Sequence, residues 1–336
     1  MNNRNAKKIA LVLGCVCLVL AFLPLLTDSR YFMHLIIMAC MNIMLGLSFS
    51  MLFSAGLITM GAAGFWGIGA YTSALLVLKV GLSFWIALPL AALMSALVAF
   101  VVGMVIVRTA GVAFIIQTMV VNMILVQVFG HFEFFGGWAG LLDIPSPSPI
   151  GPISFAGKTA NYYLILVLLL VNILAFYALY ISRIGRALSA IRLNARLAET
   201  LSVNLFRYRL ATFMISAAGA GLAGSFYAHY FQSLEPNMFN VFKSIYVQIY
   251  SILGGLNSYI LGPVIGAAII TFVPELLRVG KEIEPIMTGI VLVLLVIFLP
   301  GGILSLPERL GLFGKRASGS SSDQPSLKQE KKGATT

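Results

Sequence analysis

Charged residues are scarce in this sequence of 336 residues: aspartate, glutamate, lysine and arginine together make up only 10% of it. Soluble domains carry roughly a quarter charged residues, so a soluble globular fold is excluded. Hydrophobic residues make up 60% of the chain, and the mean hydropathy is +0.98. Because lipid cannot hydrogen-bond to an open backbone, we expect an all-α polytopic membrane protein.

Acidic residues are the rarer charges, 11 against 22 lysines and arginines, and none is expected deep within an apolar segment. The sequence shows no paired carboxylates, no His–Glu metal motif and no activated serine. It therefore predicts no catalytic residue, no metal site and no cofactor. Cys15, Cys17 and Cys40 lie in apolar segments without the spacing of zinc ligands or of a disulfide framework, which favours packing roles.

Nucleotide-binding patterns are also missing. Residues 151–159, GPISFAGKT, look like a phosphate loop, but alanine stands at position 156 where that motif needs glycine.

The net charge of +11 would suit a nucleic-acid partner. The basic residues, however, lie between the apolar segments and in the tails, where they set membrane orientation, so no nucleic acid is expected.

Apolar segments that could cross a bilayer recur along the chain and define a transmembrane domain over residues 9–310. About ten transmembrane helices are expected, over residues 9–26, 34–53, 61–80, 84–107, 111–129, 163–181, 210–230, 242–256, 262–279 and 285–299. An eight-span version, in which residues 242–279 are partly re-entrant, is the alternative.

Basic residues between the spans predict the orientation, because cytoplasmic loops carry an excess of lysine and arginine. Residues 1–8 and 182–209 are basic and are placed in the cytoplasm, together with a disordered tail over residues 311–336. Residues 130–161 are poor in base and rich in proline and glycine, which predicts an outside loop. Both termini are thus expected to be cytoplasmic.

The basic segment at residues 182–209 has an internal order that a plain connector does not need. Small or apolar residues recur at helical spacing and would share one face: Ala187, Ile191, Ala195 and Ala198. Arg192 and Arg196 lie four residues apart on another face, and Glu199 is the only acid in the segment. This pattern predicts a docking helix that is presented to a cytoplasmic partner.

Glycines crowd the start of the span at residues 61–80: Gly61, Gly64, Gly67 and Gly69. Each costs a helix up to ~1 kcal/mol relative to alanine. Two interpretations are balanced: close helix packing through small residues, and a broken or exposed backbone that lines a solute path. The path would also include Tyr71, Thr72, Gln117 and Asn122. For any single intramembrane amide, however, an interhelical hydrogen bond is the commoner role.

The segment at residues 185–228, GRALSAIRLNARLAETLSVNLFRYRLATFMISAAGAGLAGSFYA, resembles the coupling loop and following helix of the branched-chain amino acid permease family. The likeness extends to LGGLNSYILGPVIGAAIITFVPELLR and LPGGILSLPE, and back to GFWGIGAYTSALL and FGGWAGL, covering most of residues 33–310. Members of this family are membrane subunits of ATP-driven importers. The chain is similar to the M-type partner in a heterodimer of two permeases.

The resemblance implies a non-catalytic ABC importer permease bundle in a bacterial inner membrane. It implies a second permease, two cytoplasmic ATPases and an extracytoplasmic solute-binding protein as partners. ATP-driven closure of the ATPases would push on a helix at residues 185–203 and alternate the opening to branched-chain or related small amino acids. The residues implied to couple the ATPase are Gly185, Arg186, Ala187, Ala190, Ile191, Arg192, Ala195, Arg196, Ala198 and Glu199.

The chain departs from the family pattern in ways that leave the solute open. Residues 194–196 stand where acids are usual, and Phe135 stands in place of a threonine. Related permeases carry urea, amides or other small solutes. An ion-coupled secondary transporter or channel that acts alone is the alternative class, but it would usually need an acid or a charged relay deep in the membrane.

Overall fold

The computed structural model describes residues 30–149, 155, 157–255, 258–276 and 289 of the chain. In these residues the regular structure is helical, and an isolated antiparallel β-bridge joins Leu141 to Leu234. The expected all-α membrane fold is therefore confirmed.

Six helices of the described part are long and apolar enough to cross a membrane. They are α2 (Arg30–Phe53), α3 (Ala62–Val80), α4 (Phe84–Ile106), α5 (Val112–His131), α6 (Lys158–Ile181) and α9 (Leu205–Phe231). The shorter helices are α7 (Arg183–Leu193), α8 (Ala195–Thr200), α10 (Val241–Gly254) and α11 (Leu261–Leu276). Single turns of 3₁₀ helix form η1 (Glu133–Phe135), η2 (Gly137–Ala139) and η3 (Pro236–Phe239).

The number of candidate spans is lower than the ten expected. α10 has 14 residues and α11 has 16. At about 1.5 Å per residue they reach about 21 and 24 Å, which is less than a hydrocarbon core of roughly 30 Å. The span expected at residues 9–26, and all but Gly289 of the one at 285–299, lie outside the described residues. The shortness of α10 and α11 agrees with the alternative in which residues 242–279 are partly re-entrant.

The start of α9 differs from the hydropathy prediction, because the helix begins at Leu205 and not at residue 210. The side-chain oxygen of Asn204 accepts a hydrogen bond from the backbone N–H of Arg207 (3.0 Å) and caps the first turn. Arg207 and Arg209 therefore belong to the helix and not to the loop at residues 182–209. Arginine lowers the hydropathy of a span but is a good helix former.

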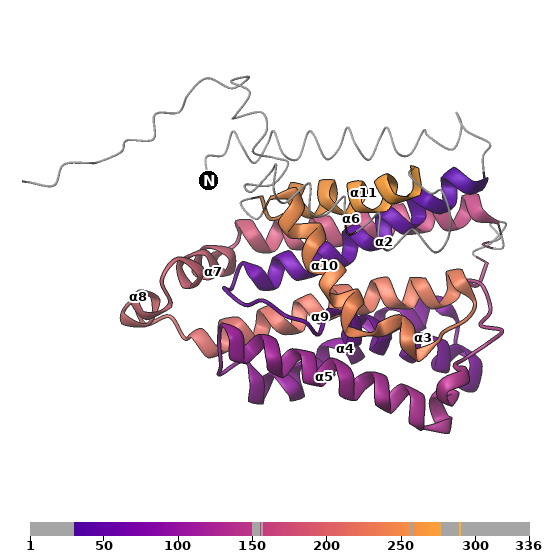
Figure 1. Cartoon of the computed structure of the whole chain (residues 1–336), viewed down its shortest axis with the longest axis horizontal. Helices are drawn as coiled ribbons and strands as arrows, with labels where there is room; N and C mark the ends of the chain where they lie inside the picture. Colours follow the sequence, from indigo (N-terminus) through magenta and orange to yellow (C-terminus); the bar gives the residue numbers. More distant parts are fainter. Residues whose placement is uncertain (1–29, 150–154, 156, 256–257, 277–288, 290–336) are drawn as a thin grey trace, which may run out of the picture.

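α9 lies at the centre of the bundle, where it packs against α2, α3 and α4 (Figure 1). Glycines make the closest of these contacts possible. A Cβ on Gly69 would strike the backbone of Gly221, and one on Gly224 would strike the carbonyl group of Trp66. α3 and α9 therefore meet backbone to backbone, as small residues allow in membrane bundles.

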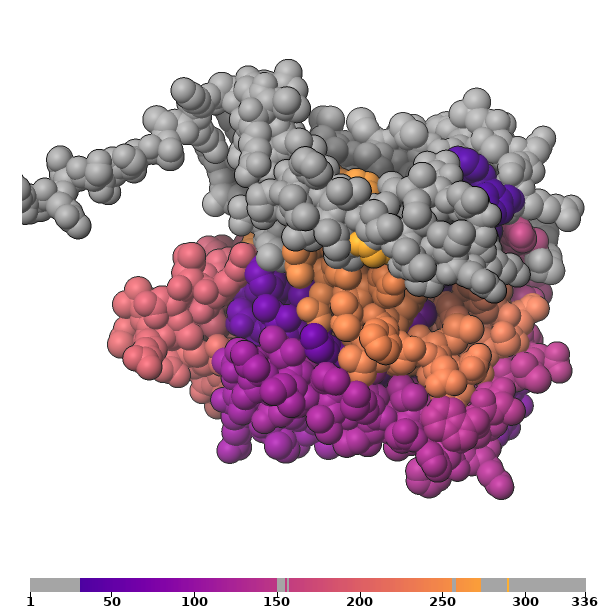
Figure 2. All heavy atoms as spheres, viewed as in Figure 1, coloured from indigo at the N-terminus to yellow at the C-terminus, as the bar shows by residue number. Residues whose placement is uncertain are grey.

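The two ends of the bundle carry different connecting segments (Figure 1). α7 and α8 project beyond the long helices at one end, and Figure 2 shows them as a lobe that stands out from the rest of the molecule. At the other end, the bridge between Leu141 and Leu234 has backbone hydrogen bonds of 2.9 and 2.8 Å and ties residues 132–149 to the end of α9. This arrangement agrees with the expected placement of the two loops on opposite sides of a membrane.

Candidate functional site

The projecting lobe is built from two helices and not from the single helix expected over residues 185–203. Ser182 caps α7, since its hydroxyl oxygen accepts from the backbone N–H of Ile184 at 3.1 Å. α7 ends at Leu193 because Asn194 is extended, with φ −157° and ψ 102°. Asn194 then caps α8 by accepting from the N–H of Leu197 at 3.1 Å. Arg192 and Arg196 therefore belong to different helices.

The apolar face expected to enter a partner is already partly buried inside the chain. Ile191 and Ala198 are each 2% exposed, and Leu188 is fully buried, so these side chains pack against the permease's own helices. Ala187, Ala190 and Ala195 are half-buried. Helical spacing predicted one amphipathic helix, whereas the structure has two, with Ile191 and Ala198 buried against the chain itself. Docking of an ATPase through Ala187, Ala190 and Ala195 stays a prediction.

A different set of apolar residues faces away from the bundle. Leu193 is 88% exposed, Leu197 59% and Leu201 70%. Leu193 ends α7, Leu197 lies in α8 and Leu201 follows α8 directly, so the three exposed leucines all belong to the projecting lobe. Basic residues of the same segment are also exposed: Arg183, Arg186, Arg196 and Arg207. Glu199 is exposed as well. The lobe thus exposes leucines and arginines together, a composition suited to a protein partner.

Gly185 places this lobe on the end of α6. A Cβ at Gly185 would collide with the carbonyl oxygen of Tyr180, so only glycine permits the tight turn from α6 into α7. Arg186 helps to close the same turn, since its guanidinium donates to the carbonyl oxygen of Ile181 at 3.2 Å. A displacement of the lobe would therefore act directly on the end of a long helix.

Arg192 points into its own chain, where the prediction was that it would reach acidic groups on a partner. Its guanidinium donates to the hydroxyl of Tyr259 at 2.8 Å and lies 4.3 Å from the ring centroid of Phe53. Tyr180 stacks on Tyr259 with a centroid distance of 4.8 Å. This cluster, formed by Phe53, Tyr180, Arg192 and Tyr259, connects α7 to the ends of α2 and α6 and to the segment before α11.

The four glycines at the start of α3 are all buried at contacts with other segments. A Cβ on Gly64 would lie 2.8 Å from the amide oxygen of Asn122, and one on Gly67 would lie 2.9 Å from the rings of Phe129 and Phe239. α3 is continuous from Ala62 onwards, so the expectation of a broken backbone is wrong here. Close packing explains these glycines, and their place on a solute path stays a prediction.

The other residues predicted on that path are distributed over several contacts. Asn122 donates to the carbonyl oxygen of Phe239 (3.1 Å), and Gln117 accepts from the hydroxyl of Thr109 (2.7 Å). Both amides therefore join segments, which is the commoner role. Tyr71 and Thr72 line an apolar cavity of about 490 Å³ between α3, α4 and α5.

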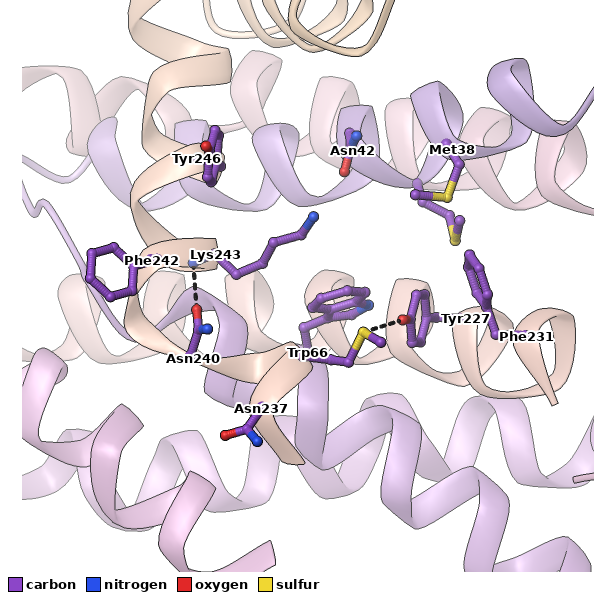
Figure 3. Close-up of a pocket in the computed structure, with 12 residues that line it drawn as sticks. Met38, Asn42, Trp66, Tyr227, Phe231, Asn237, Asn240, Phe242, Lys243 and Tyr246 are labelled. Atoms are coloured by element: carbon purple, nitrogen blue, oxygen red, sulfur yellow. Dashed lines mark hydrogen bonds between the residues drawn. The ribbon is translucent and has the colours of Figure 1, made fainter. Parts of the chain in front are cut away.

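A second cavity, of about 430 Å³, lies between α2, α3, α9, η3 and α10 (Figure 3). Its wall combines aromatic rings and methionines with a few polar groups, as small-molecule sites do. The residues that line it are Met38, Met41, Asn42, Trp66, Tyr227, Phe231, Asn237, Met238, Asn240, Phe242, Lys243 and Tyr246.

Comparison with known proteins decides the class of molecule. The family described as "Branched-chain amino acid transport system / permease component" matches residues 31–300. The chain belongs to this family. It is therefore a multi-pass transport permease of the bacterial inner membrane, a class that is non-catalytic by itself.

Curated relatives of this permease are transport subunits. It is 31% identical to the "High-affinity branched-chain amino acid transport system permease protein LivM" of Salmonella typhimurium, over 83% of its own length and 71% of that protein. The LivM protein of Escherichia coli strain K12 is 33% identical over 79% of this chain and 66% of its own length. The "Nucleoside ABC transporter permease protein NupC" of Lactococcus lactis is 29% identical over 52% of the chain. No solved structure matches.

Lys243 of this permease is a candidate functional residue that is not among those predicted from the sequence, although its position carries a signal. It lies one residue inside an apolar segment expected to span the membrane, at residues 242–256. Ionisable residues within membrane segments are rare and are functional candidates by default. Asn42, Trp66 and Tyr227, by contrast, carry no pattern that brings them together, because they come from three helices far apart in the sequence.

Proposed function

We propose that this permease is the membrane-spanning subunit of an ATP-driven importer for branched-chain or related small amino acids. The names of its relatives support the solute class. The proposal that transport is driven by ATP rests on the projecting lobe, where Leu193, Leu197 and Leu201 are exposed in a segment rich in arginine. Exposed apolar residues that cluster, as these leucines do within residues 193–201, are candidates for a protein-interaction site.

The proposed partners are a second permease of the same family, two cytoplasmic ATPases and an extracytoplasmic solute-binding protein. The lobe would dock on one ATPase through its leucines, with Arg196 facing acidic groups on the partner's surface. In this proposal the arginine-rich lobe and both termini are cytoplasmic, since lysine and arginine accumulate on that side.

Transmission from the lobe to the spans would use two connections. The turn at Gly185 joins α7 to α6, and the cluster of Phe53, Tyr180, Arg192 and Tyr259 joins it to α2 and to the segment before α11. A push on α8 by the closing ATPases would then tilt α2 and α6 together. Opening would alternate between the two sides without any nucleotide bound to the permease.

A matched pair of leucine substitutions tests the docking proposal. Leu197→Asp places a charge on the exposed side of α8, and Leu142→Asp makes the same change at a leucine of similar exposure (59% and 66%) at the opposite end of the bundle. We expect Leu197→Asp to lose the ATPases during purification and to abolish ATP-driven uptake into vesicles. Leu142→Asp should keep the ATPases bound. Full ATPase binding and uptake by Leu197→Asp would overturn the proposal.

The solute and the energy source have alternatives that the same preparation separates. A relative named for nucleosides shows that the family is not confined to amino acids, so uptake of leucine should be competed with a nucleoside, urea and an amide. An ion-coupled transporter or channel would instead move solute as the permease alone, without ATPases. Uptake that requires both the ATPases and ATP excludes that class.

A further inference from the structure

The cavity between α2, α3, α9, η3 and α10 contains a cation, Lys243, that has no counter-charge in the part of the chain that the structure describes. Lys243 extends from the first turn of α10 into the space between Asn42 on α2 and Trp66 on α3 (Figure 3). Its ammonium group lies 5.9 Å from the centre of the Trp66 ring. Among the described residues it has no hydrogen-bond acceptor and no ion-pair partner. A charge inside a membrane bundle is costly to leave unpaired, which points to an anionic ligand.

A second buried donor lies on the same wall. Trp66 is 3% exposed, and its indole Nε1 has no hydrogen-bond partner in the described part of the chain. Buried indole N–H groups are usually paired. The indole N–H is enclosed by protein atoms, so the charged donor that a ligand's carboxylate could reach is Lys243.

Asn42 provides the opposite kind of group. Its amide nitrogen donates to the hydroxyl of Thr271 at 3.0 Å, which directs the amide oxygen away from that contact. In Figure 3 this oxygen faces the space that the Lys243 side chain enters. An acceptor beside a cationic donor suits a zwitterion, whose ammonium group would meet Asn42 while its carboxylate meets Lys243.

The remaining wall is apolar and includes Met38, Met41 and Phe231. Tyr227 adds a ring, and its hydroxyl is already used by a contact of 3.1 Å to the sulfur of Met238. The volume of about 430 Å³ lies at the lower end of the range of about 300–1,000 Å³ for small-molecule sites. An aliphatic side chain fits such a wall better than a polar one.

We propose that this cavity is a solute-binding site that selects a carboxylate-bearing zwitterion with an apolar side chain, with Lys243 holding the carboxylate. The inference rests on the proposed function and narrows it, because urea, amides and nucleosides carry no carboxylate to pair with Lys243. It also places the selective site between α2, α3 and α10 and not along the glycines of α3.

The test uses the assembled transporter in detergent, without the solute-binding protein, and measures binding of radiolabelled leucine in competition with unlabelled leucine or leucinamide. The two competitors differ at the carboxyl group. We expect the wild type to prefer leucine. Lys243→Met, which keeps the length and apolar stem of the side chain, should bind leucine about 10- to 100-fold more weakly and leucinamide nearly unchanged. Lys243→Arg should keep most of the preference.

The outcomes separate this inference from the proposed function. Loss of ATPase binding or of ATP-driven uptake by the wild type would count against the function. A wild type that imports leucine but binds leucine and leucinamide equally would overturn the inference, even if Lys243→Met failed to assemble. Unchanged discrimination in an assembled Lys243→Met complex would do the same and would leave Lys243 with a structural role only.

Discussion

At the scale of single residues, Arg192 shows why an arginine in a basic loop is not simply surface charge. Its guanidinium is fixed between the hydroxyl of Tyr259 and the ring of Phe53. Hydrogen bonds to charged groups are stronger than neutral ones, and a cation over an aromatic ring adds to them. Arg196, four residues later, is exposed and has no such contacts in the described part of the chain.

Replacing Arg192 with methionine should therefore destabilise the permease and weaken coupling, while Arg196→Met should leave stability unchanged. The loss of one charged hydrogen bond and one ring contact predicts a destabilisation of about 2 kcal/mol. The measurement is the midpoint of thermal unfolding in detergent, followed by the ratio of solute imported to ATP hydrolysed. Tyr259→Phe, which keeps the ring and removes the hydroxyl, should give an intermediate effect. Equal midpoints for Arg192→Met and Arg196→Met would show that the cluster has no structural role.

The same segment shows how much of the structure of the lobe could be predicted from the sequence. The spacing of Ala187, Ile191 and Ala198 correctly indicated helix with an apolar side. The orientation of α7 relative to the bundle depends on the tight turn at Gly185 and on the contact between Arg192 and Tyr259. These last two residues are 67 positions apart in the sequence. Such tertiary contacts have no signature in local periodicity, so the burial of Ile191 and Ala198 against the chain itself could not be predicted from the sequence.

At the scale of whole elements, the six long helices follow the hydropathy of the sequence closely, because each must bury its backbone hydrogen bonds within one apolar segment. α10 does not follow it. Its segment is apolar, yet the helix has only 14 residues and is held by polar contacts. Gln248 donates to the carbonyl oxygen of Thr59 at 3.0 Å, and Ser244 accepts from the N–H of Ala63 at 2.9 Å. These bonds attach α10 to the start of α3.

Removing one of these bonds should loosen α10, which carries Lys243. Gln248→Met keeps the size of the side chain and leaves the carbonyl group of Thr59 without its donor, a cost of about 1–3 kcal/mol. Gln127→Met makes the same change at an exposed position on α5 and serves as the control. We expect faster amide hydrogen exchange across residues 241–254 in Gln248→Met alone. Identical exchange in the two variants would mean that packing, and not this hydrogen bond, fixes the helix.

The contact between α3 and α9 gives a sharper steric prediction. A Cβ at Gly224 would meet the carbonyl group of Trp66, whereas one at Gly157 would meet no atom within 4 Å. Gly224→Ala should therefore reduce the yield of folded protein in size-exclusion chromatography, since overpacking costs roughly 1–3 kcal/mol. Gly157→Ala should behave as the wild type. A normal yield of Gly224→Ala would show that the two helices can separate without penalty.

At the scale of the whole molecule, the bundle separates two kinds of surface. The lobe of α7 and α8 is rich in arginine, and the opposite end, with Leu141 bridged to Leu234, is poor in lysine and arginine. The sequence predicted this separation from charge alone. It could not predict that α9 would be central, because that depends on backbone contacts between Gly69 and Gly221, which belong to separate glycine-rich segments.

The separation predicts which end of the permease faces the cytoplasm. Leu193, 88% exposed on the lobe, and Leu142, 66% exposed at the other end, are suited to single cysteine substitutions. The background would carry serine at Cys15, Cys17 and Cys40. In spheroplasts, a membrane-impermeant maleimide should label Leu142→Cys at once and Leu193→Cys only after the membrane is opened. If Leu193→Cys were labelled first, the arginine-rich lobe would face outward, away from ATP. The exposed leucines of the lobe could then not receive force from an ATPase, and the proposed energy source would have to be abandoned.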